Sequence, residues 1–215
     1  MNSLPTEETS SSFDKFLNDH PNTDFVRVYW LDFSARLRVK VITRMFCQAL
    51  ASNGSYLTAG SNCLNKVVDT SASAGGLKCG TNEIYPDWPT LRPCPHSPGH
   101  ASVLSTVRHI GDNFECCPRM TLKRMQAKLE ELGITTAVGF EIELAIFEGS
   151  AEAPQPLEIG TGWLDSAVLR SKYLVVLEEM VGALEASAIP VREFHPESGS
   201  QGTRPVSLSV AFFKR

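Results

Sequence analysis

Two glutamates, Glu141 and Glu143, interrupt an otherwise apolar run over residues 137–147. The branched and aromatic residues of this run predict a strand, and residues two apart in a strand share a face. Two carboxylates roughly 7 Å apart repel by about 2 to 3 kcal/mol at an effective dielectric of about 20. A divalent cation such as Mg²⁺ or Mn²⁺ would offset that repulsion, because hard cations prefer oxygen ligands. A protonated carboxyl group and a solvated edge strand are the alternatives that the spacing leaves open.

A second predicted strand, residues 189–197, also carries possible ligands. By the period of two, three of its polar side chains share one face: Glu193, His195 and Glu197. If this strand is a neighbour of the first in one sheet, Glu141, Glu143 and Glu197 could converge on a common cation. For His195 the competing interpretation is a hydrogen-bonded structural histidine, because hard-cation sites prefer oxygen. For Glu193 it is a solvated edge residue.

Composition excludes several classes of function. The chain has 215 residues, of which 42% are hydrophobic, and its 20 basic and 24 acidic residues give a net charge of -4. That balance, without a basic stripe interleaved with aromatic residues, argues against a nucleic-acid partner. Residues 1–12 lack the basic and apolar regions of a secretory signal, and no run approaches membrane-spanning length. We therefore expect a cytoplasmic protein with no membrane or nucleic-acid partner.

The cysteines are expected to be reduced thiols. None of the six lies in a Cys-x-x-Cys pair, and the chain shows no secretory signal that would favour disulfides. A structural zinc site is not expected either, because His96, His100 and His109 lie in a stretch that supplies only Cys94 nearby.

The first half predicts a small mixed domain behind a polar leader. Residues 1–20 are rich in Ser, Thr and Glu and are expected to be mobile, with at most a short helix over 13–17. Alternating apolar residues then predict a β-hairpin. The remaining expectations are an amphipathic segment over 43–52, a long loop-rich stretch over 53–98 and a strand over 101–109.

The second half repeats one arrangement. Helical spacing predicts a helix over 118–132 that ends at Gly133 and leads into the strand of Glu141. After a Pro- and Gly-rich loop over 149–163, a second helix over 165–187 leads into the strand of Glu197. The two helix-strand units predict an α+β protein.

Several segments resemble the glutamine synthetase family, and its fungal glutamine synthetase-like branch most of all. Residues 138–144, Val-Gly-Phe-Glu-Ile-Glu-Leu, resemble the family's Gly-x-Glu-x-Glu-Phe segment, and residues 194–199, Phe-His-Pro-Glu-Ser-Gly, resemble its His-x-Glu segment. The similarity runs in order from Phe25 to Gly202. Further matching segments are 28–32, 36–38, 85–92 and 117–119.

The resemblance implies a fold and an activity. Residues 21–112 are expected to form a β-grasp-like N-terminal domain, and residues 113–202 the opening portion of a catalytic domain, with two helix-strand units of an antiparallel sheet. The family joins a small-molecule carboxylate to ammonia or an amine, using ATP and Mg²⁺ or Mn²⁺ through an acyl-phosphate. Divalent cations suit this chemistry because they neutralise phosphate oxygens. Family members assemble as homo-oligomeric rings.

By matched position, the resemblance assigns three metal ligands. Glu143 and Glu197 would ligate the cation nearer the carboxylate substrate, and Glu141 the cation that holds the nucleotide phosphates. Catalytic and substrate-binding residues stay unassigned.

Residues 203–215 are expected to be a divergent tail. Arg204 and Pro205 stand where the family carries a further glutamate ligand, and no acidic residue follows Glu197, so the cation site is expected to bind weakly. The alternating tail is able to add one strand.

The primary expectation is a glutamine synthetase-like ligase, truncated within the catalytic domain and inactive alone. The alternative is a non-catalytic subunit or interaction protein that associates with full-length homologues. A small metal-dependent hydrolase ranks last, because no nucleophile or general-base pairing is visible.

Overall fold

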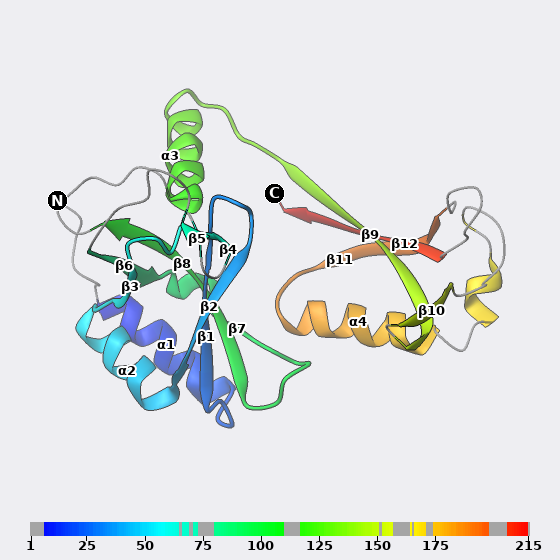
Figure 1. Cartoon of the computed structure of the whole chain (residues 1–215), viewed down its shortest axis with the longest axis horizontal. Helices are drawn as coiled ribbons and strands as arrows, with labels where there is room; N and C mark the ends of the chain where they lie inside the picture. The colour runs from blue at the N-terminus through cyan, green and yellow to red at the C-terminus, as the bar shows by residue number, and fades with distance from the viewer. Residues whose placement is uncertain are drawn as a thin grey trace. The chain divides into compact units, whose positions relative to one another are not determined.

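The computed structural model describes residues 7–64, 66–68, 71–72, 80–109, 117–150, 152–156, 164, 166–170, 174–197 and 206–214. The chain divides into two compact units, Met1–Thr135 and Thr136–Arg215 (Figure 1). Both units combine helices with strands, which confirms the α+β class.

The first unit is built on a mixed sheet with the strand order β2-β1-β8-β6-β3. Strand β1 runs parallel to β8 and antiparallel to β2, and the remaining pairs are antiparallel. Short β7 also pairs with β8, and β4 and β5 form a separate two-stranded sheet. The strands are β1 (Phe25–Leu31), β2 (Leu37–Thr43), β3 (Leu57–Gly60), β4 (Lys66–Val68), β5 (Ser71–Ala72), β6 (Thr81–Pro86), β7 (Arg92–Pro93) and β8 (His100–His109).

The predicted hairpin is confirmed as β1 and β2, and Asp32 forms its turn. The Oδ1 atom of Asp32 accepts hydrogen bonds from the backbone N–H groups of Ser34 and Arg36, both at 2.9 Å. Its Oδ2 atom accepts from Nε of Arg38 at 2.8 Å. Ala35 adopts a left-handed φ of 57°, which the tight reversal requires. The turn is therefore held by one buried carboxylate.

Helices α1 (Glu7–Asp19) and α2 (Arg44–Asn53) supply the core on one side of this sheet. Alternate residues of β1 are buried, as period two requires, and α2 begins at Thr43, whose side chain caps the helix by accepting from Phe46 N–H. The helical and strand residues of this core include Phe13, Leu17, Val26, Val28, Trp30, Cys47, Leu50, Ala51, Ile84, Val103 and Val107.

The short helix expected over 13–17 is part of a longer helix, α1, which extends over residues 7–19 of the polar leader. Phe13, Phe16 and Leu17 lie three and four positions apart, so a helix brings them to one face despite the polar residues around them. Phe13 is 1% exposed, and its ring lies 5.3 Å from that of Trp88, in the short helix η1 (Trp88–Thr90). Burial of this face orders the helix.

Replacing Phe13 by alanine is expected to lower the free energy of unfolding by about 3 to 5 kcal/mol, because the change leaves a cavity in the core. Phe46→Ala is the matched control, because Phe46 is 48% exposed on α2. Chemical denaturation followed by tryptophan fluorescence measures both. Equal losses in the two variants would show that α1 is not part of the core.

The stretch over 53–98 is more regular than its composition predicts. It contains β3 to β7 and η1, all elements of six residues or fewer. Asn82 and Ile84 of β6 are buried and alternate with less buried neighbours, but a two-residue pattern is too short to be recognised in the sequence. Such strands depend on their neighbours in the sheet.

Helix α3 (Pro118–Glu131) confirms the helix predicted over 118–132, and one carboxylate anchors its first turns within the first unit. Asp87 Oδ2 lies 2.5 Å from Nη2 of Arg119 and 2.8 Å from Nζ of Lys123. Burial alone would raise the pKa of Asp87, but the hydrogen bonds and charges of Lys123 and Arg119 outweigh burial and lower it.

Asp87→Asn is expected to destabilise α3 by about 1 to 2 kcal/mol, because two cations lose a half-buried partner. Hydrogen exchange measures this change directly. The amides of α3 should exchange faster in the variant, while those of β1 should not. Unchanged protection of α3 would contradict the anchoring role of Asp87.

The second unit is an antiparallel sheet with the order β10-β9-β12-β11. Its elements are β9 (Val138–Ser150), β10 (Ala153–Pro156), the short helix η2 (Ser166–Arg170), α4 (Leu174–Ala186), β11 (Val191–Glu197) and β12 (Val206–Lys214). Within the helix predicted over 165–187 the structure describes η2 and α4, and residues 171–173 lie outside the described residues. The tail forms the strand that its alternation predicts.

Across the parts of the chain that the structure describes, no helix combines the length and apolar character needed to cross a membrane.

Candidate functional site

The acidic strands β9 and β11 belong to one sheet, as expected, but they are not adjacent strands in it. Strand β12 lies between them and pairs with both. Adjacent strands are about 4.8 Å apart, so β9 and β11 are separated by roughly 10 Å. The sequence could not show this, because the alternation of the tail predicts a strand but not which strands it pairs with.

The register nevertheless brings the predicted ligand positions to one face. Directly opposed residues of antiparallel strands share a face, and two consecutive rows run from β9 through β12 to β11. In the first row Glu141 pairs with Ala211, which pairs with Glu193. In the second row Glu143 pairs with Ser209, which pairs with His195.

A third row completes this carboxylate face. Ala145 pairs with Ser207, which pairs with Glu197. The only irregularity lies between Val191 and Glu193, before these rows begin, so the alternation is preserved from Glu193 to Glu197. We use the name carboxylate face for the positions of the three rows: Glu141, Glu143, Glu193, His195 and Glu197, with Ala145 and β12 residues Ser207, Ser209 and Ala211.

The middle strand contributes only small residues to the carboxylate face. Ser207, Ser209 and Ala211 occupy its positions between the acidic strands. Sequence reasoning missed this feature, although the alternation of Ser and Ala in the tail was visible.

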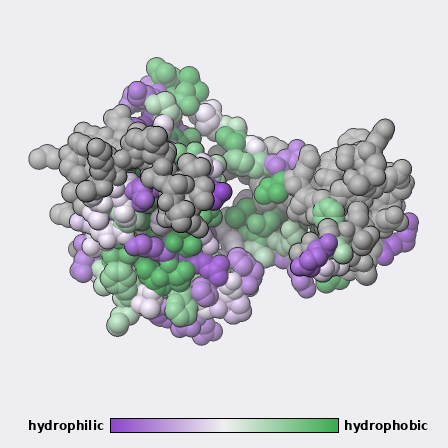
Figure 2. Space-filling model, in the orientation of Figure 1, coloured by the Kyte–Doolittle hydropathy of each residue, from purple (hydrophilic) through white to green (hydrophobic). Residues whose placement is uncertain are grey.

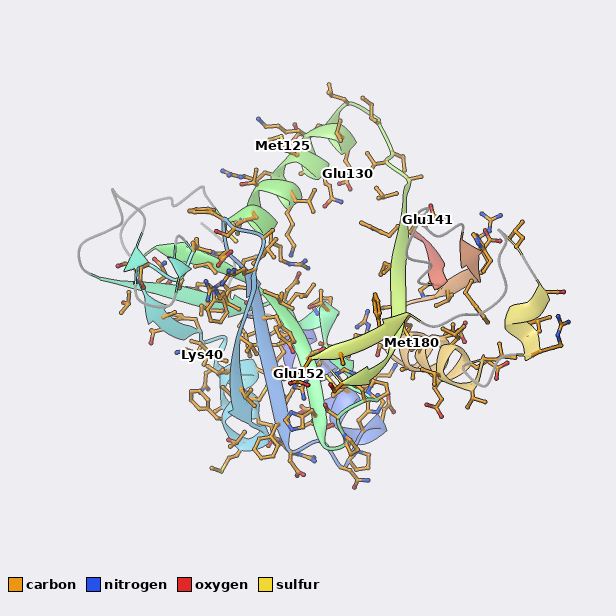
Figure 3. The ribbon with its side chains drawn as sticks, turned by 45° about the vertical axis from the view of Figure 1, so that its right-hand side comes forward. Lys40, Met125, Glu130, Glu141, Glu152 and Met180 are labelled. Carbon is orange, nitrogen blue, oxygen red and sulfur yellow. The ribbon has the colours of Figure 1, made fainter. Side chains whose placement is uncertain are left out.

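Described side chains on this face are accessible. Glu141 and Glu193 are exposed and His195 is half-buried. Figure 3 labels Glu141 on β9, the strand that pairs with β12. The backbone places Glu143 and Glu197 at their register positions.

The donor chemistry of the carboxylate face fits a hard divalent cation. Four of its five polar positions on β9 and β11 carry carboxylates, and Mg²⁺ and Mn²⁺ prefer oxygen ligands. No three His, Cys, Asp or Glu residues close enough to hold a metal occur among the described side chains, a set without Glu143 and Glu197. The departure at Arg204 and Pro205 also lies outside the described residues.

The other face of the same strands is apolar. Phe140 pairs with Phe212, and Ile142 pairs with Val210, which pairs with Phe194. On this face, Phe140 and Ile142 of β9 are exposed. In the same unit, Leu177 of α4 is buried. The sheet thus has one acidic and one apolar face.

The part of the chain that carries the carboxylate face also matches a known protein family. The family model described as "Glutamine synthetase, catalytic domain" matches residues 115–209. This match includes α3, β9 and β11, and it extends into β12. Among curated proteins, protein fluG of Emericella nidulans is 26% identical over 197 residues, which cover 86% of this chain and 22% of that protein.

Solved structures show the same fold. "Apo GmaS without ligand" aligns with a TM-score of 0.70 and 16% identity, over 91% of this chain and 44% of that chain. "GmaS/ADP complex-Conformation 1" aligns with a TM-score of 0.67 and 15% identity, over 100% and 45%. The cryo-EM structure of Plasmodium falciparum glutamine synthetase aligns with a TM-score of 0.65 and 13% identity, over 100% and 46%. The chain therefore spans less than half the length of each of these proteins.

Proposed function

We propose that this chain contributes part of the active site of an ATP-dependent carboxylate-amine ligase, because residues 115–209 match the model of the glutamine synthetase catalytic domain. The supporting observation is the carboxylate face, which lies within the matched residues except for Ala211. The proposed substrates are a small-molecule carboxylate, ammonia or an amine, and ATP. One of the similar structures is described as an ADP complex, which agrees with a nucleotide substrate for this chain.

We propose a metal-binding role for each of three glutamates of the carboxylate face. Glu143 and Glu197 would hold Mg²⁺ or Mn²⁺ beside the carboxylate substrate, and Glu141 would hold the cation of the nucleotide phosphates. When bound, such cations neutralise phosphate oxygens during phosphoryl transfer. The chain's own contribution is to fix the carboxylates at register positions on two strands, with small residues between them.

We propose that these 215 residues do not catalyse the reaction by themselves. The chain spans 44–46% of the length of the similar structures, and Arg204 and Pro205 stand where the resemblance expects a glutamate ligand. A cation held by fewer carboxylates, near an arginine, binds more weakly and is less well positioned.

The proposed domain organisation follows the resemblance. Residues 21–112 would be the β-grasp-like domain and residues 113–202 the opening of the catalytic domain, with 203–215 as a tail that departs from the family in sequence. The mixed sheet with its parallel β1–β8 pair and its helices on one side supports the first assignment. We also propose a cytoplasmic location, which cell fractionation tests.

An ATP- and Mg²⁺-dependent ligase assay tests the proposed function. The chain is assayed alone and joined to a complete catalytic half of a family member, with glutamate and other carboxylates offered together with ammonia and amines. We expect product only from the joined protein, and loss of that product in its Glu143→Gln variant. Activity of the 215-residue chain, or full activity of the joined variant, would overturn the proposal.

A second candidate, a non-catalytic subunit of a homo-oligomer or of a complex with longer homologues, rests on an exposed apolar surface of the first unit. On the sheet face away from α1 and α2, the β1–β2 pairings align residues that are 39–57% exposed: Phe25, Leu31, Leu37, Val39 and Val41. Figure 2 shows hydrophobic surface in the region of β1 and β2. Co-purification with a full-length homologue supports this candidate, and a strictly monomeric chain counts against it.

A further inference from the structure

Paired residues of β2, β1 and β8 form rows across the first unit's sheet, on the face away from α1 and α2. The first row is Thr43, Phe25 and His100, the second is Val41, Arg27 and Ser102, and the third is Val39, Tyr29 and Leu104. Val28 and its partner Val103, in an alternate row, are buried in the core, so the three rows lie on the opposite face. We use the name outer face for the three rows together with Leu31 and its partner Leu37.

Most large side chains of the outer face are apolar and accessible to solvent. Its apolar side chains that are 38–57% exposed are Phe25, Leu31, Leu37, Val39, Val41 and Leu104. They come from three neighbouring strands, so they form one patch rather than scattered positions. An exposed apolar patch of this kind is typical of a protein-interaction site.

The outer face also carries positive charge. Arg27, in the middle row, is its one residue with a formal charge at neutral pH, and it is half-buried. The Nε atom of Arg27 donates a hydrogen bond to Nδ1 of His100 at 3.3 Å, and no carboxylate among the described residues forms an ion pair with Arg27. Half-buried Arg92 of β7 pairs with Ser102 of the same row, and its Nη1 atom donates to two backbone oxygens. Such cations favour a partner that brings a carboxylate.

The dimensions of the outer face fit one helix. Three neighbouring strands span about 10 Å, which is close to the diameter of a helix with its side chains. Along β1, the distance from Phe25 to Leu31 is about 20 Å, which corresponds to roughly 13 helical residues. Helices α1 and α2 already cover the opposite face of this sheet, and sheets with helices on both faces are a stable arrangement of layers. A second copy of the outer face is a poor occupant, because it would oppose like cations.

We propose that the outer face binds an amphipathic helix of a partner protein, whose apolar residues cover the exposed side chains and whose carboxylate pairs with Arg27. Arginine suits this role, because its planar guanidinium pairs with a carboxylate through two parallel hydrogen bonds. Half-buried Tyr29, in the adjacent row, is of a residue type that often carries much of the binding energy of an interface. The inference rests on the second candidate function and names the chemistry of its partner, and it does not depend on ligase activity.

A peptide pair tests the charge preference of the outer face on the full chain. The probe is a fluorescein-labelled amphipathic helix of about 14 residues, with leucines spaced three and four positions apart and glutamates beside them. The second peptide carries lysine in place of each glutamate. Fluorescence anisotropy should show about 10-fold tighter binding of the glutamate peptide, because its carboxylates meet Arg27. Arg27→Glu should reverse this preference, which also shows that the variant is folded.

A second pair of variants locates the binding surface. Val41→Glu should weaken binding of the glutamate peptide, because it places a carboxylate beside Arg27 and removes an apolar contact. Met45→Glu should not, because Met45 is 79% exposed on α2. Circular dichroism verifies the fold of both variants.

The proposal is overturned if the wild-type chain binds neither peptide, if it binds both equally, or if Arg27→Glu keeps the original preference. Sedimentation of the chain as a dimer that Val41→Glu dissociates would assign the outer face to a second copy instead. Co-purification with a full-length homologue despite such a failure would show that the second candidate function operates through another surface.

Discussion

Replacing Asp32 by alanine is expected to lower the free energy of unfolding of the first unit by about 3 to 5 kcal/mol, the usual cost of breaking a buried ion pair. The Asp32 side chain is 0% exposed, and it is the common acceptor for Ser34, Arg36 and Arg38. Its removal leaves two backbone N–H groups and one guanidinium without this acceptor. Urea denaturation measures the loss.

Two matched variants make this prediction specific. Asp32→Asn keeps an oxygen for the backbone N–H groups but removes the charge, so its loss should be smaller than that of alanine. Asp19→Asn, at an exposed position of α1, should change stability by no more than about 0.5 kcal/mol. Equal losses in Asp32→Ala and Asp19→Asn would contradict the role of the turn.

The contribution of Asp32 to stability should also appear in the pH dependence of the free energy of unfolding. Burial would raise the pKa of Asp32, but hydrogen bonds from Arg36, Arg38 and Ser34 and the charge of Arg38 outweigh burial and lower it. A lowered folded-state pKa means that the stabilisation is fully present above the ordinary value of 3.8 and is lost as pH falls through the folded value. The Asp32→Asn protein should therefore lose less stability than wild type between pH 4 and acid unfolding.

Glu143→Gln is expected to weaken Mn²⁺ binding to the chain by roughly 10- to 100-fold, since even outer-shell substitutions at metal sites reach this size. Glu197→Gln should have a similar effect, because the proposal gives both residues to one cation. Isothermal titration at low salt measures the affinity. The reason is chemical: glutamine keeps the shape of the side chain but loses the charge that a hard cation needs.

Glu148→Gln is the matched control for the Mn²⁺ prediction. Glu148 lies on the same strand as Glu143 but five residues away, so the alternation assigns it to the opposite face. This variant should bind Mn²⁺ like wild type. If all three variants bind alike, the carboxylate face is not the cation site.

Strong local patterns predicted much of the fold. The β1–β2 hairpin, the helix from Pro118 and the strands of Glu141 and Glu197 all carry clear periodicity, and all form. The short strands within 53–98 could not be predicted, because two or three residues give no period and their pairing partners are distant in the chain. Helix α1 was predicted only over residues 13–17, because its polar composition outweighed the spacing of its few apolar residues.

The sequence could indicate which residues belong to the candidate site, but not the order of the strands that carry them. The spacing of Glu141 and Glu143 indicated a shared face, and the register of β9 agrees with that face. The position of β12 between β9 and β11 depends on long-range pairing that no local pattern encodes. No sequence signal therefore indicated that Ser209 would pair with both Glu143 and His195.

Paramagnetic broadening by Mn²⁺ tests most directly whether a cation binds on the carboxylate face. In a backbone-labelled chain, substoichiometric Mn²⁺ should first broaden the amide signals of the three rows, around Glu143 on β9, Ser209 on β12 and His195 on β11. Signals of the acidic end of α3, around Glu130, should persist to higher Mn²⁺. Broadening that begins at α3, or that is uniform over the chain, would contradict a cation site on this sheet.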